Sequence, residues 1–444
     1  MQYDVVIVGG GVTGTALLYT LRNYTNIENI LLVEKYPTFS ELNSNSQSNS
    51  QTLHFGDIES NYTLEKARET KHASEMLLAY LNELPEGENA ALVKKCHKML
   101  LGVGEEEVKF LKRRFSKEMR ELFPELRYLS KDEITAIEPK ITEGRDPTEE
   151  IGALYSEKGY MVDFGKLSTS FVEHSKSCKK TGLEILLGTE VTRVKRTSDG
   201  FLLSTNKSTY TTRTVVFAAG TYSLYFAKML GYGKNLSTLS VGGSFYYTPH
   251  VLNGKVYRVE KGSVPFAAVH GDPDLNFPER TRFGPTATVL PLLEKGNFKT
   301  FSAYIKTAGL NGEAMFSIKS VLSDPEIKRI MAKNIKYGVP VIGKYSFLRD
   351  EARKIVPSLK YSDLKFADNT GGIRPQVIDI KKRKILMGEL KITGNNVIFN
   401  MTPSPGATAC IQTAYEDVDE IVRFIGAKFN RELFKKQFNQ VNSV

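Results

Sequence analysis

The 444 residues, 41% hydrophobic and 25% charged, have the composition of a soluble globular protein with room for more than one domain. No run of 18 apolar residues appears, so no transmembrane helix is predicted, and the three cysteines and six histidines are too scattered to predict a disulfide framework or a metal site. The formal charge of +10 comes without a nucleic-acid-binding motif. It favours anionic partners, such as a membrane surface or a substrate, or serves solubility alone.

The strongest pattern lies at the start of the chain. A β-branched run at 5–8 predicts a buried parallel strand, an apolar helix follows around 16–21, and a second strand is predicted at 30–33. The first strand and the helix are separated by glycines in G-x-G-x-x-G order: Gly9, Gly11 and Gly14. This order predicts a βαβ unit that binds a dinucleotide, with a glycine-rich turn in another βαβ unit as the alternative.

Each of these positions has a physical task. Gly9 allows a tight turn, Gly11 lets backbone N–H groups approach a pyrophosphate, and Gly14 lets the helix pack closely on the strand. The helix N-terminus adds partial positive charge for the phosphates. Glu34 follows at the spacing of about 20 residues that is typical of the acid bonding a ribose diol.

A loop of small polar residues, 43–51, comes next. Its composition alone predicts disorder, but its position just after Glu34 places it near the cofactor. We expect cofactor contacts from Asn49, Ser50, Gln51 and Thr52. His54 then lies close to a flavin ring, in either a chemical or a structural role.

Residues 63–150 are mostly helical in pattern. A helix is predicted over 65–81, before Pro85. In 105–123, apolar residues recur every three or four positions with basic residues on the other side, and 314–338 repeats this pattern. Each of these two stretches is either a surface helix with a core-facing stripe or a basic amphipathic helix on a membrane.

Strand patterns begin near 151. A helix is expected from Lys166, a hairpin turns at 198–200, and a buried strand at 214–220 ends in a small-residue turn against the cofactor. The cofactor candidates here are Val191, Ala219 and Gly220. Further strand-like stretches follow at 243–247, 264–270 and 282–287.

The tail returns to cofactor chemistry. Residues 370–376 precede a strand at 396–400, and 402–408 open a helix over 409–425. Free N–H groups at that helix start suit the flavin edge where negative charge develops on reduction. The cofactor candidates here are Gly372, Pro405, Gly406, Ala407 and Thr408.

Several short stretches, taken together and in this order, resemble the 2-hydroxyacid flavoprotein dehydrogenases with a D-amino-acid-oxidase-like fold, such as L-2-hydroxyglutarate dehydrogenases. They are 49–54, 243–247, 268–270, 284–287, 372–376 and 404–408. Two more, 58–63 and 269–274, are similar to malate:quinone oxidoreductases, most of all the shorter bacterial form. The resemblance spans nearly the whole chain.

This resemblance implies FAD as cofactor, oxidation of (S)-malate to oxaloacetate, transfer of electrons to a membrane quinone, and peripheral attachment to an anionic membrane surface. The first strand begins close to Met1 and leaves no room for a signal peptide, so we expect a cytoplasmic protein on the inner face of the cell membrane. Open alternatives are a dehydrogenase of L-lactate or L-2-hydroxyglutarate, a soluble oxidase using oxygen, and a non-catalytic nucleic-acid-binding protein.

The expected fold is α/β with mixed α+β character. A Rossmann-like FAD-binding domain is discontinuous, over 1–75, 151–235 and 355–444. A helical segment, 76–150, and a substrate domain on a mostly antiparallel sheet, 236–354, complete the chain.

Oxidation of a 2-hydroxy acid moves a hydride to the flavin and the hydroxyl proton to a base, for which histidine suits neutral pH. His270 is the first candidate base and His54 the second, and each has a structural role as the alternative. Arg374 offers a planar fork for a carboxylate, or a structural salt bridge. Weaker substrate candidates are Lys344 and Arg282 for the second carboxylate and Tyr246 and Tyr247 as hydroxyl donors.

Overall fold

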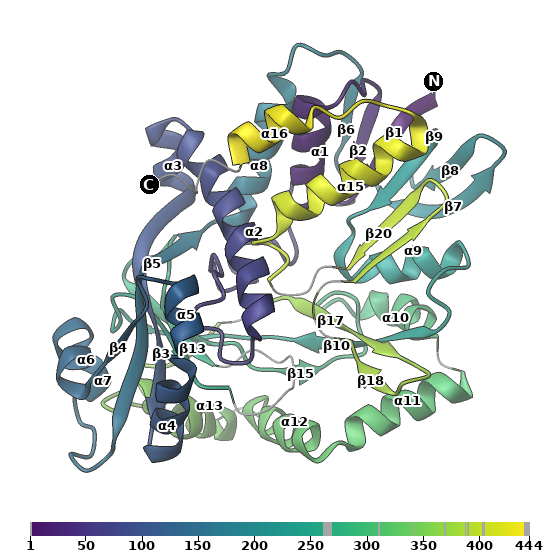
Figure 1. Cartoon of the computed structure of the whole chain (residues 1–444). Coiled ribbons are helices and arrows are strands. Elements are labelled where there is room, and N and C mark those ends of the chain that lie inside the picture. Colours follow the sequence, from purple (N-terminus) through teal and green to yellow (C-terminus); the bar gives the residue numbers. More distant parts are fainter. Residues whose placement is uncertain are drawn as a thin grey trace.

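The computed structural model describes residues 2–260, 269–309, 311–339, 341–367, 370–386, 388, 390–401 and 405–438. Within these residues the strands form three sheets, and helices pack on each of them (Figure 1). None of the described helices is both long and apolar enough to span a membrane.

The first sheet confirms the Rossmann-like expectation. It runs in the order β19-β20-β9-β1-β2-β6, and β7 and β8 continue from β9 as an antiparallel meander. Its strands are β1 (Gln2–Val8), β2 (Ile30–Val33), β6 (Leu183–Leu186), β7 (Val191–Thr197), β8 (Gly200–Thr205), β9 (Thr209–Phe217), β19 (Leu390–Gly394) and β20 (Val397–Met401). In β1, Val5 and Ile7 join one core while Val6 and Val8 join another, so burial on both faces explains the unbroken apolar run.

Helices cover both faces of this sheet. One face carries α1 (Val12–Tyr24), α2 (Leu64–Glu83), α8 (Phe164–Lys176), α15 (Cys410–Ile425) and α16 (Arg431–Phe438), and the other carries α9 (Ser223–Met229). The N- and C-terminal parts of the chain therefore lie together, because α15 packs directly on α1 (Figure 1). The helices predicted over 65–81 and 409–425 and the one near Lys166 are confirmed.

The second sheet runs in the order β16-β11-β14-β13-β12-β3-β5-β4. Its strands are β3 (Val93–Val103), β4 (Arg127–Leu129), β5 (Ile151–Val162), β11 (Tyr246–Pro249), β12 (Lys255–Arg258), β13 (His270–Pro273), β14 (Arg280–Gly284) and β16 (Lys365–Phe366). The long pair β3–β5 is antiparallel, and β3 joins β12 in parallel. Residues 151–162 therefore share a sheet with strands of the expected substrate domain.

The third sheet, in the order β15-β10-β17-β18, lies beside the first sheet. Its strands are β10 (Leu236–Gly242), β15 (Thr288–Val289), β17 (Ile373–Asp379) and β18 (Lys384–Ile385). The helices that contact this sheet are α10 (Phe301–Ala308), α11 (Gly312–Ser323) and α12 (Pro325–Tyr337), and α13 (Ile342–Phe347) follows α12 and packs on the second sheet. The remaining elements are α3 (Glu86–Leu92), α4 (Glu105–Arg114), α5 (Lys117–Leu122), α6 (Lys131–Ile137), α7 (Pro139–Thr142), α14 (Arg353–Ile355), η1 (Gly220–Tyr222), η2 (Phe298–Thr300) and η3 (Leu348–Ala352).

The structure refines the expectations for two segments and describes only part of a third. The 76–150 segment is not wholly helical, because 93–103 forms β3; three lysines interrupt its apolar pattern, and one of them, Lys98, is buried against Asp57. Residues 105–123 form two helices, since Ser116 caps α5, and their apolar stripe is buried in the core rather than free for a membrane. Of the strand expected at 264–270, residues 264–268 lie outside the described residues. The domain boundaries themselves stay a prediction.

Candidate cofactor and substrate site

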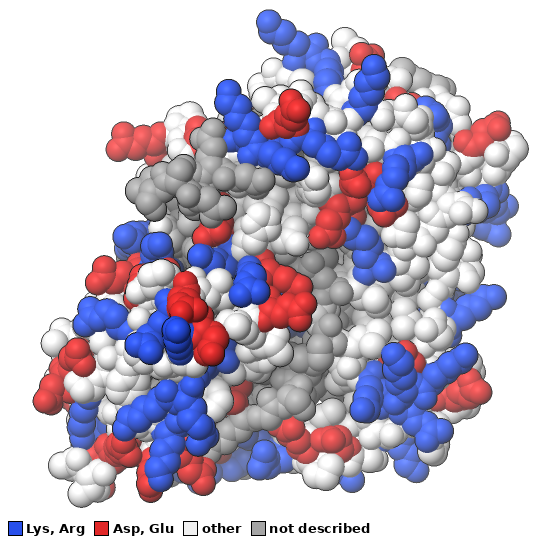
Figure 2. Space-filling model, in the orientation of Figure 1, with Lys and Arg blue, Asp and Glu red and all other residues white. Residues whose placement is uncertain are grey.

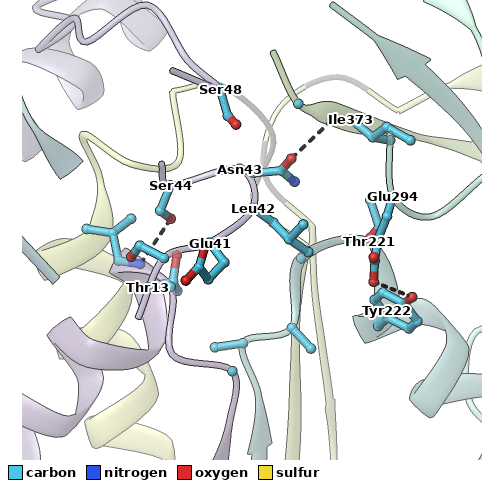
Figure 3. Close-up of a pocket in the computed structure, with 18 of the residues that line it drawn as sticks. Thr13, Glu41, Leu42, Asn43, Ser44, Ser48, Thr221, Tyr222, Glu294 and Ile373 are labelled. Atoms are coloured by element: carbon cyan, nitrogen blue, oxygen red, sulfur yellow. Dashed lines mark hydrogen bonds between the residues drawn. The ribbon is translucent and has the colours of Figure 1, made fainter. Parts of the chain in front are cut away.

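A cavity of about 710 Å³ opens beyond the carboxyl ends of β1, β2 and β9. Figure 3 shows the 41–48 loop on one side of it and Thr221, Tyr222 and Glu294 on the other. Most predicted cofactor residues line it: Gly9, Gly11, Glu34, Asn49, Ser50, Thr52, Val191, Ala219, Gly220, Gly372, Pro405, Gly406, Ala407 and Thr408. Gly14 and Gln51 do not.

The first turn requires glycines because neighbouring backbone atoms come too close for a Cβ. Gly9 has φ +116°, and a Cβ there would stand 2.4 Å from the carbonyl oxygen of Ala218. A Cβ on Gly14 would stand 2.0 Å from the carbonyl oxygen of Gly9, so Gly14 serves packing behind the cavity wall. The N–H groups at the start of α1 therefore lie at the cavity wall, where they can donate hydrogen bonds to an anionic pyrophosphate.

Glu34 lies at the end of β2 and lines the cavity. Its Oε2 accepts a hydrogen bond from the Gly10 N–H at 2.6 Å, and its Oε1 accepts one from the Tyr36 N–H at 2.9 Å. Burial raises the pKa of Glu34, while these hydrogen bonds and Lys35 oppose the rise. Each carboxylate oxygen has two lone pairs, so both keep capacity for a ribose hydroxyl.

A buried carboxylate that the sequence did not single out, Glu294, lines the same end of the cavity. It accepts hydrogen bonds from the hydroxyls of Tyr36 and Tyr222, each at 2.7 Å, and from the Asn297 amide at 2.8 Å. It also pairs with Lys35. Burial would raise the pKa of Glu294, but these partners lower it, so the carboxylate is ionised and ties the end of β2 to η1 and to the 294–297 turn.

The polar loop 43–51 has a defined structure built on hydrogen bonds. Ser44 Oγ accepts the backbone N–H at the start of α1 at 3.1 Å, and Asn43 Oδ1 accepts the Ile373 N–H at 3.1 Å (Figure 3). Gln51 turns away from the cavity, and its amide bonds 274–275. The loop therefore joins the dinucleotide turn to β17.

The opposite end of the cavity is lined by 372–375, 405–408 and His54. The Thr408 hydroxyl accepts the backbone N–H of His54 at 3.1 Å, which fixes the histidine beside the 405–408 turn. The helix α15 begins at Cys410, and the Thr408 and Ala409 N–H groups already donate to the Pro405 carbonyl. Fewer donors are therefore free at that helix start than the sequence predicted.

His54 belongs to a buried charged group. Its Nδ1 lies 2.7 Å from Oε1 of Glu59, and nearby Lys98 pairs with Asp57 at 2.7 Å. Burial would raise the pKa of Glu59, but the hydrogen bond and charge of His54 bring it down to about 2. Glu59 is thus a carboxylate that accepts a hydrogen bond from Nδ1, and in the neutral form of the imidazole this places the lone pair that can accept a proton on Nε2.

His270 does not line the cavity. It is buried on β13, with Nδ1 at 2.6 Å from Asp272 Oδ2 and its ring 4.6 Å from that of Tyr257. Burial lowers the pKa of His270, although Asp272 opposes this. The Tyr257 hydroxyl in turn lies 2.8 Å from Thr52 Oγ1, so Tyr257 stands between His270 and the cavity wall.

Arg374, on β17, lines the cavity near His54. Its guanidinium forms no hydrogen bond or ion pair with any other residue that the structure describes, although its backbone pairs with Val241 of β10. Burial lowers the pKa of its guanidinium, while Tyr257 and Glu260 favour the charge electrostatically. An arginine remains charged throughout the physiological range, so the cavity wall carries a cation whose fork is open to an anion.

The other predicted substrate residues lie elsewhere. Arg282 is buried and donates to the carbonyls of Ser46 and Asn49, which braces the polar loop. Tyr246 stacks on Phe347 in the core, and Arg280 covers the ring of Tyr247. Lys344 lies over the ring of Tyr361. None of the four lines the cavity, so their substrate roles stay predictions without support from this geometry.

Sequence reasoning missed Glu294, Tyr257 and Glu59. The first two come from segments without a local motif, and only Glu59 had an available signal, since it follows His54 closely in the chain. Among the described residues no cluster of three or more His, Cys, Asp or Glu side chains is arranged to hold a metal ion.

The family of FAD dependent oxidoreductases matches residues 4–415, so the fold and site define a flavoprotein oxidoreductase with FAD as its cofactor. The glycine turn, Glu34 and the long cavity fit that dinucleotide. More narrowly, the chain belongs to the malate:quinone oxidoreductases. It is 40% identical to a probable malate:quinone oxidoreductase of Campylobacter jejuni, over 98% of this chain and 99% of that one, and 38% identical to the malate:quinone oxidoreductase of Helicobacter pylori, over 99% and 98%.

Solved structures share the fold. L-alpha-glycerophosphate oxidase from Mycoplasma pneumoniae, with FAD bound, superposes with a TM-score of 0.65 at 20% identity, covering 97% of this chain and 96% of that one. Glycine oxidase from Geobacillus kaustophilus gives a TM-score of 0.65 at 19% identity, covering 95% of each chain. These two support the architecture and say nothing of the substrate.

Proposed function

We propose that this chain oxidises (S)-malate to oxaloacetate at the Arg374 end of the cavity and passes the electrons through FAD to a quinone. The observation that carries the proposal is the Arg374 guanidinium, which lines the cavity without a partner among the described residues. Its planar fork matches a carboxylate of a dicarboxylic acid. The names of the Campylobacter and Helicobacter relatives support malate as that acid.

In this proposal Arg374 orients malate and His54 takes the proton of its hydroxyl. Nδ1 of His54 faces the ionised Glu59, so Nε2 is the atom that accepts the proton. When bound, FAD supplies the acceptor for the hydride that leaves the carbinol carbon. His270 becomes the second choice, because Tyr257 stands between it and the cavity wall.

The proposal includes attachment of the protein to an anionic membrane surface on the inner face of the cell membrane. A quinone with a lipid-soluble tail is reached from that surface, and a chain with a formal charge of +10 is attracted to anionic lipids. The charge also serves association with an anionic substrate.

The test is turnover of the purified holoprotein with a soluble dye acceptor and, separately, with a short-chain quinone. Malate should be oxidised with both acceptors, and L-lactate and L-2-hydroxyglutarate should be poor substrates. Activity with lactate or 2-hydroxyglutarate but not with malate would reject the substrate. Peroxide production without quinone dependence would indicate an oxidase instead.

A further inference from the structure

The exposed apolar side chains of this protein are concentrated in one part of the chain. Of the thirteen large hydrophobic residues that are exposed in the described structure, eleven lie between Phe298 and Phe366. Six of them belong to α11, α12, α13 and the residue just before α13: Met315, Phe316, Ile335, Val341, Ile342 and Tyr345. Scattered single apolar residues are normal on a surface, but such a concentration indicates an interaction site.

The helices α11 and α12 show these side chains on their outer faces. Val321 of α11 and Ile327 of α12 pack into one core with Leu239 and Ile378 of the third sheet. The opposite faces therefore look away from the molecule, and α11, α12 and α13 follow one another along the lower edge of the view in Figure 1. Because both helices have already buried a stripe against the sheet, the exposed residues are not needed for the core.

The start of α13 adds two more exposed apolar side chains. Val341 is 71% exposed and Ile342 57% exposed. Val341 also has φ +63° and ψ −59°, a backbone conformation that is strained for a β-branched residue. An exposed apolar residue in a strained conformation gains nothing in water, whereas insertion into an apolar phase offsets the cost.

Basic side chains surround this apolar group. Exposed cations on the two helices are Lys319, Lys328, Arg329 and Lys336, and the exposed turn 381–384 has the sequence Lys-Lys-Arg-Lys. The turn is adjacent, since the Arg383 guanidinium lies 4.5 Å from the ring centre of Phe316. Figure 2 shows Lys and Arg side chains gathered at the lower right, over α11 and β18.

We propose that these apolar and basic residues form a docking face for an anionic lipid bilayer, an inference that rests on the proposed use of a membrane quinone. The apolar side chains enter the boundary between headgroups and acyl chains, and the cations contact the anionic headgroups. The charge decides against a second copy of this chain as the occupant, because a symmetric contact would bring two basic surfaces together.

The test is sedimentation of the holoprotein with vesicles of phosphatidylcholine, with and without phosphatidylglycerol. The wild type should bind only the anionic vesicles, and salt should weaken binding. Phe316→Ser combined with Ile335→Ser should lower partitioning at least about tenfold, and so should Lys381→Glu with Lys382→Glu. The matched controls are Met229→Ser with Leu433→Ser, and Lys94→Glu with Lys95→Glu, which change exposed residues outside the docking face and should bind normally.

Three results would overturn the docking face: no vesicle binding by the wild type, equal losses in test and control variants, or loss of a dimer instead of loss of vesicle binding in light scattering. Malate turnover with the soluble dye, measured on the same variants, should stay at the wild-type level. An absence of malate turnover in the wild type would reject the proposed function alone, since vesicle binding is read independently.

Discussion

The two ends of the cavity differ in whether backbone or side chains shape the wall. At the Glu34 end, backbone within residues 2–34 shapes the pyrophosphate side of the wall, through a glycine turn, the start of a helix and the ends of two parallel strands. Glu294, from a distant segment, only holds Lys35 and Tyr36 beside it. At the Arg374 end, the shape comes from side chains of segments that are far apart in the chain, such as His54, Arg374 and Thr408. The first end is therefore sensitive to a single added carbon atom, and the second to the loss of a charge or a proton acceptor.

The largest effect should follow from Gly9→Ala, which breaks the dinucleotide end. The new Cβ would lie 2.4 Å from the Ala218 carbonyl oxygen at a φ of +116°, so the backbone must shift where the pyrophosphate binds. We expect purified protein with less than about a tenth of the wild-type flavin, measured by absorbance after denaturation. Gly87→Ala, at a position with open space around it, is the control and should retain flavin. Full flavin content in Gly9→Ala would place the dinucleotide elsewhere.

His54→Ala should lower catalysis at the Arg374 end of the cavity and leave FAD binding at the Glu34 end intact. Loss of a general base lowers turnover by about 10²- to 10⁴-fold, while the flavin content and spectrum stay normal. His270→Ala is the comparison and should have a clearly smaller effect, because His270 does not line the cavity. Glu59→Gln should fall between them, since it removes the charge that orients Nδ1. If His270→Ala lost more activity than His54→Ala, the two histidines would have to exchange roles.

Arg374→Lys tests the fork at the same end. A point charge replaces a planar bidentate donor, and we expect kcat/KM for malate to fall about 100-fold, mostly through KM. Arg280→Lys, which leaves the cavity wall unchanged, is the matched control. If Arg374 holds the carboxylate that both acids share, kcat/KM for a monocarboxylic 2-hydroxy acid should fall by the same factor as kcat/KM for malate. An unchanged KM for malate in Arg374→Lys would remove Arg374 from the substrate site.

This contrast also explains what could be predicted from the sequence. The βαβ unit and its glycines are determined by neighbours in the chain, so a local pattern predicts them. The strand at 93–103 escaped prediction because buried Lys98, paired with Asp57, gives a polar signal at a core position. Tyr257 has no local motif at all, and only the pairing of β12 with β13 and β3 brings it beside His270.

The smallest effect, a modest loss of FAD affinity, is expected from a change of Glu294 at the dinucleotide end of the cavity. Glu294 comes from the segment between β15 and α10, yet it holds Lys35, Tyr36 and Tyr222 together at the cavity wall. Glu294→Gln keeps the shape and removes the charge, so we expect FAD to dissociate about tenfold more readily, with near-normal turnover at saturating FAD. Fluorescence of released flavin on dilution measures this, and Glu279→Gln, an exposed site off the cavity, is the control. Equal flavin release from both variants would mean that Glu294 only stabilises the fold, and that the dinucleotide end depends on backbone alone.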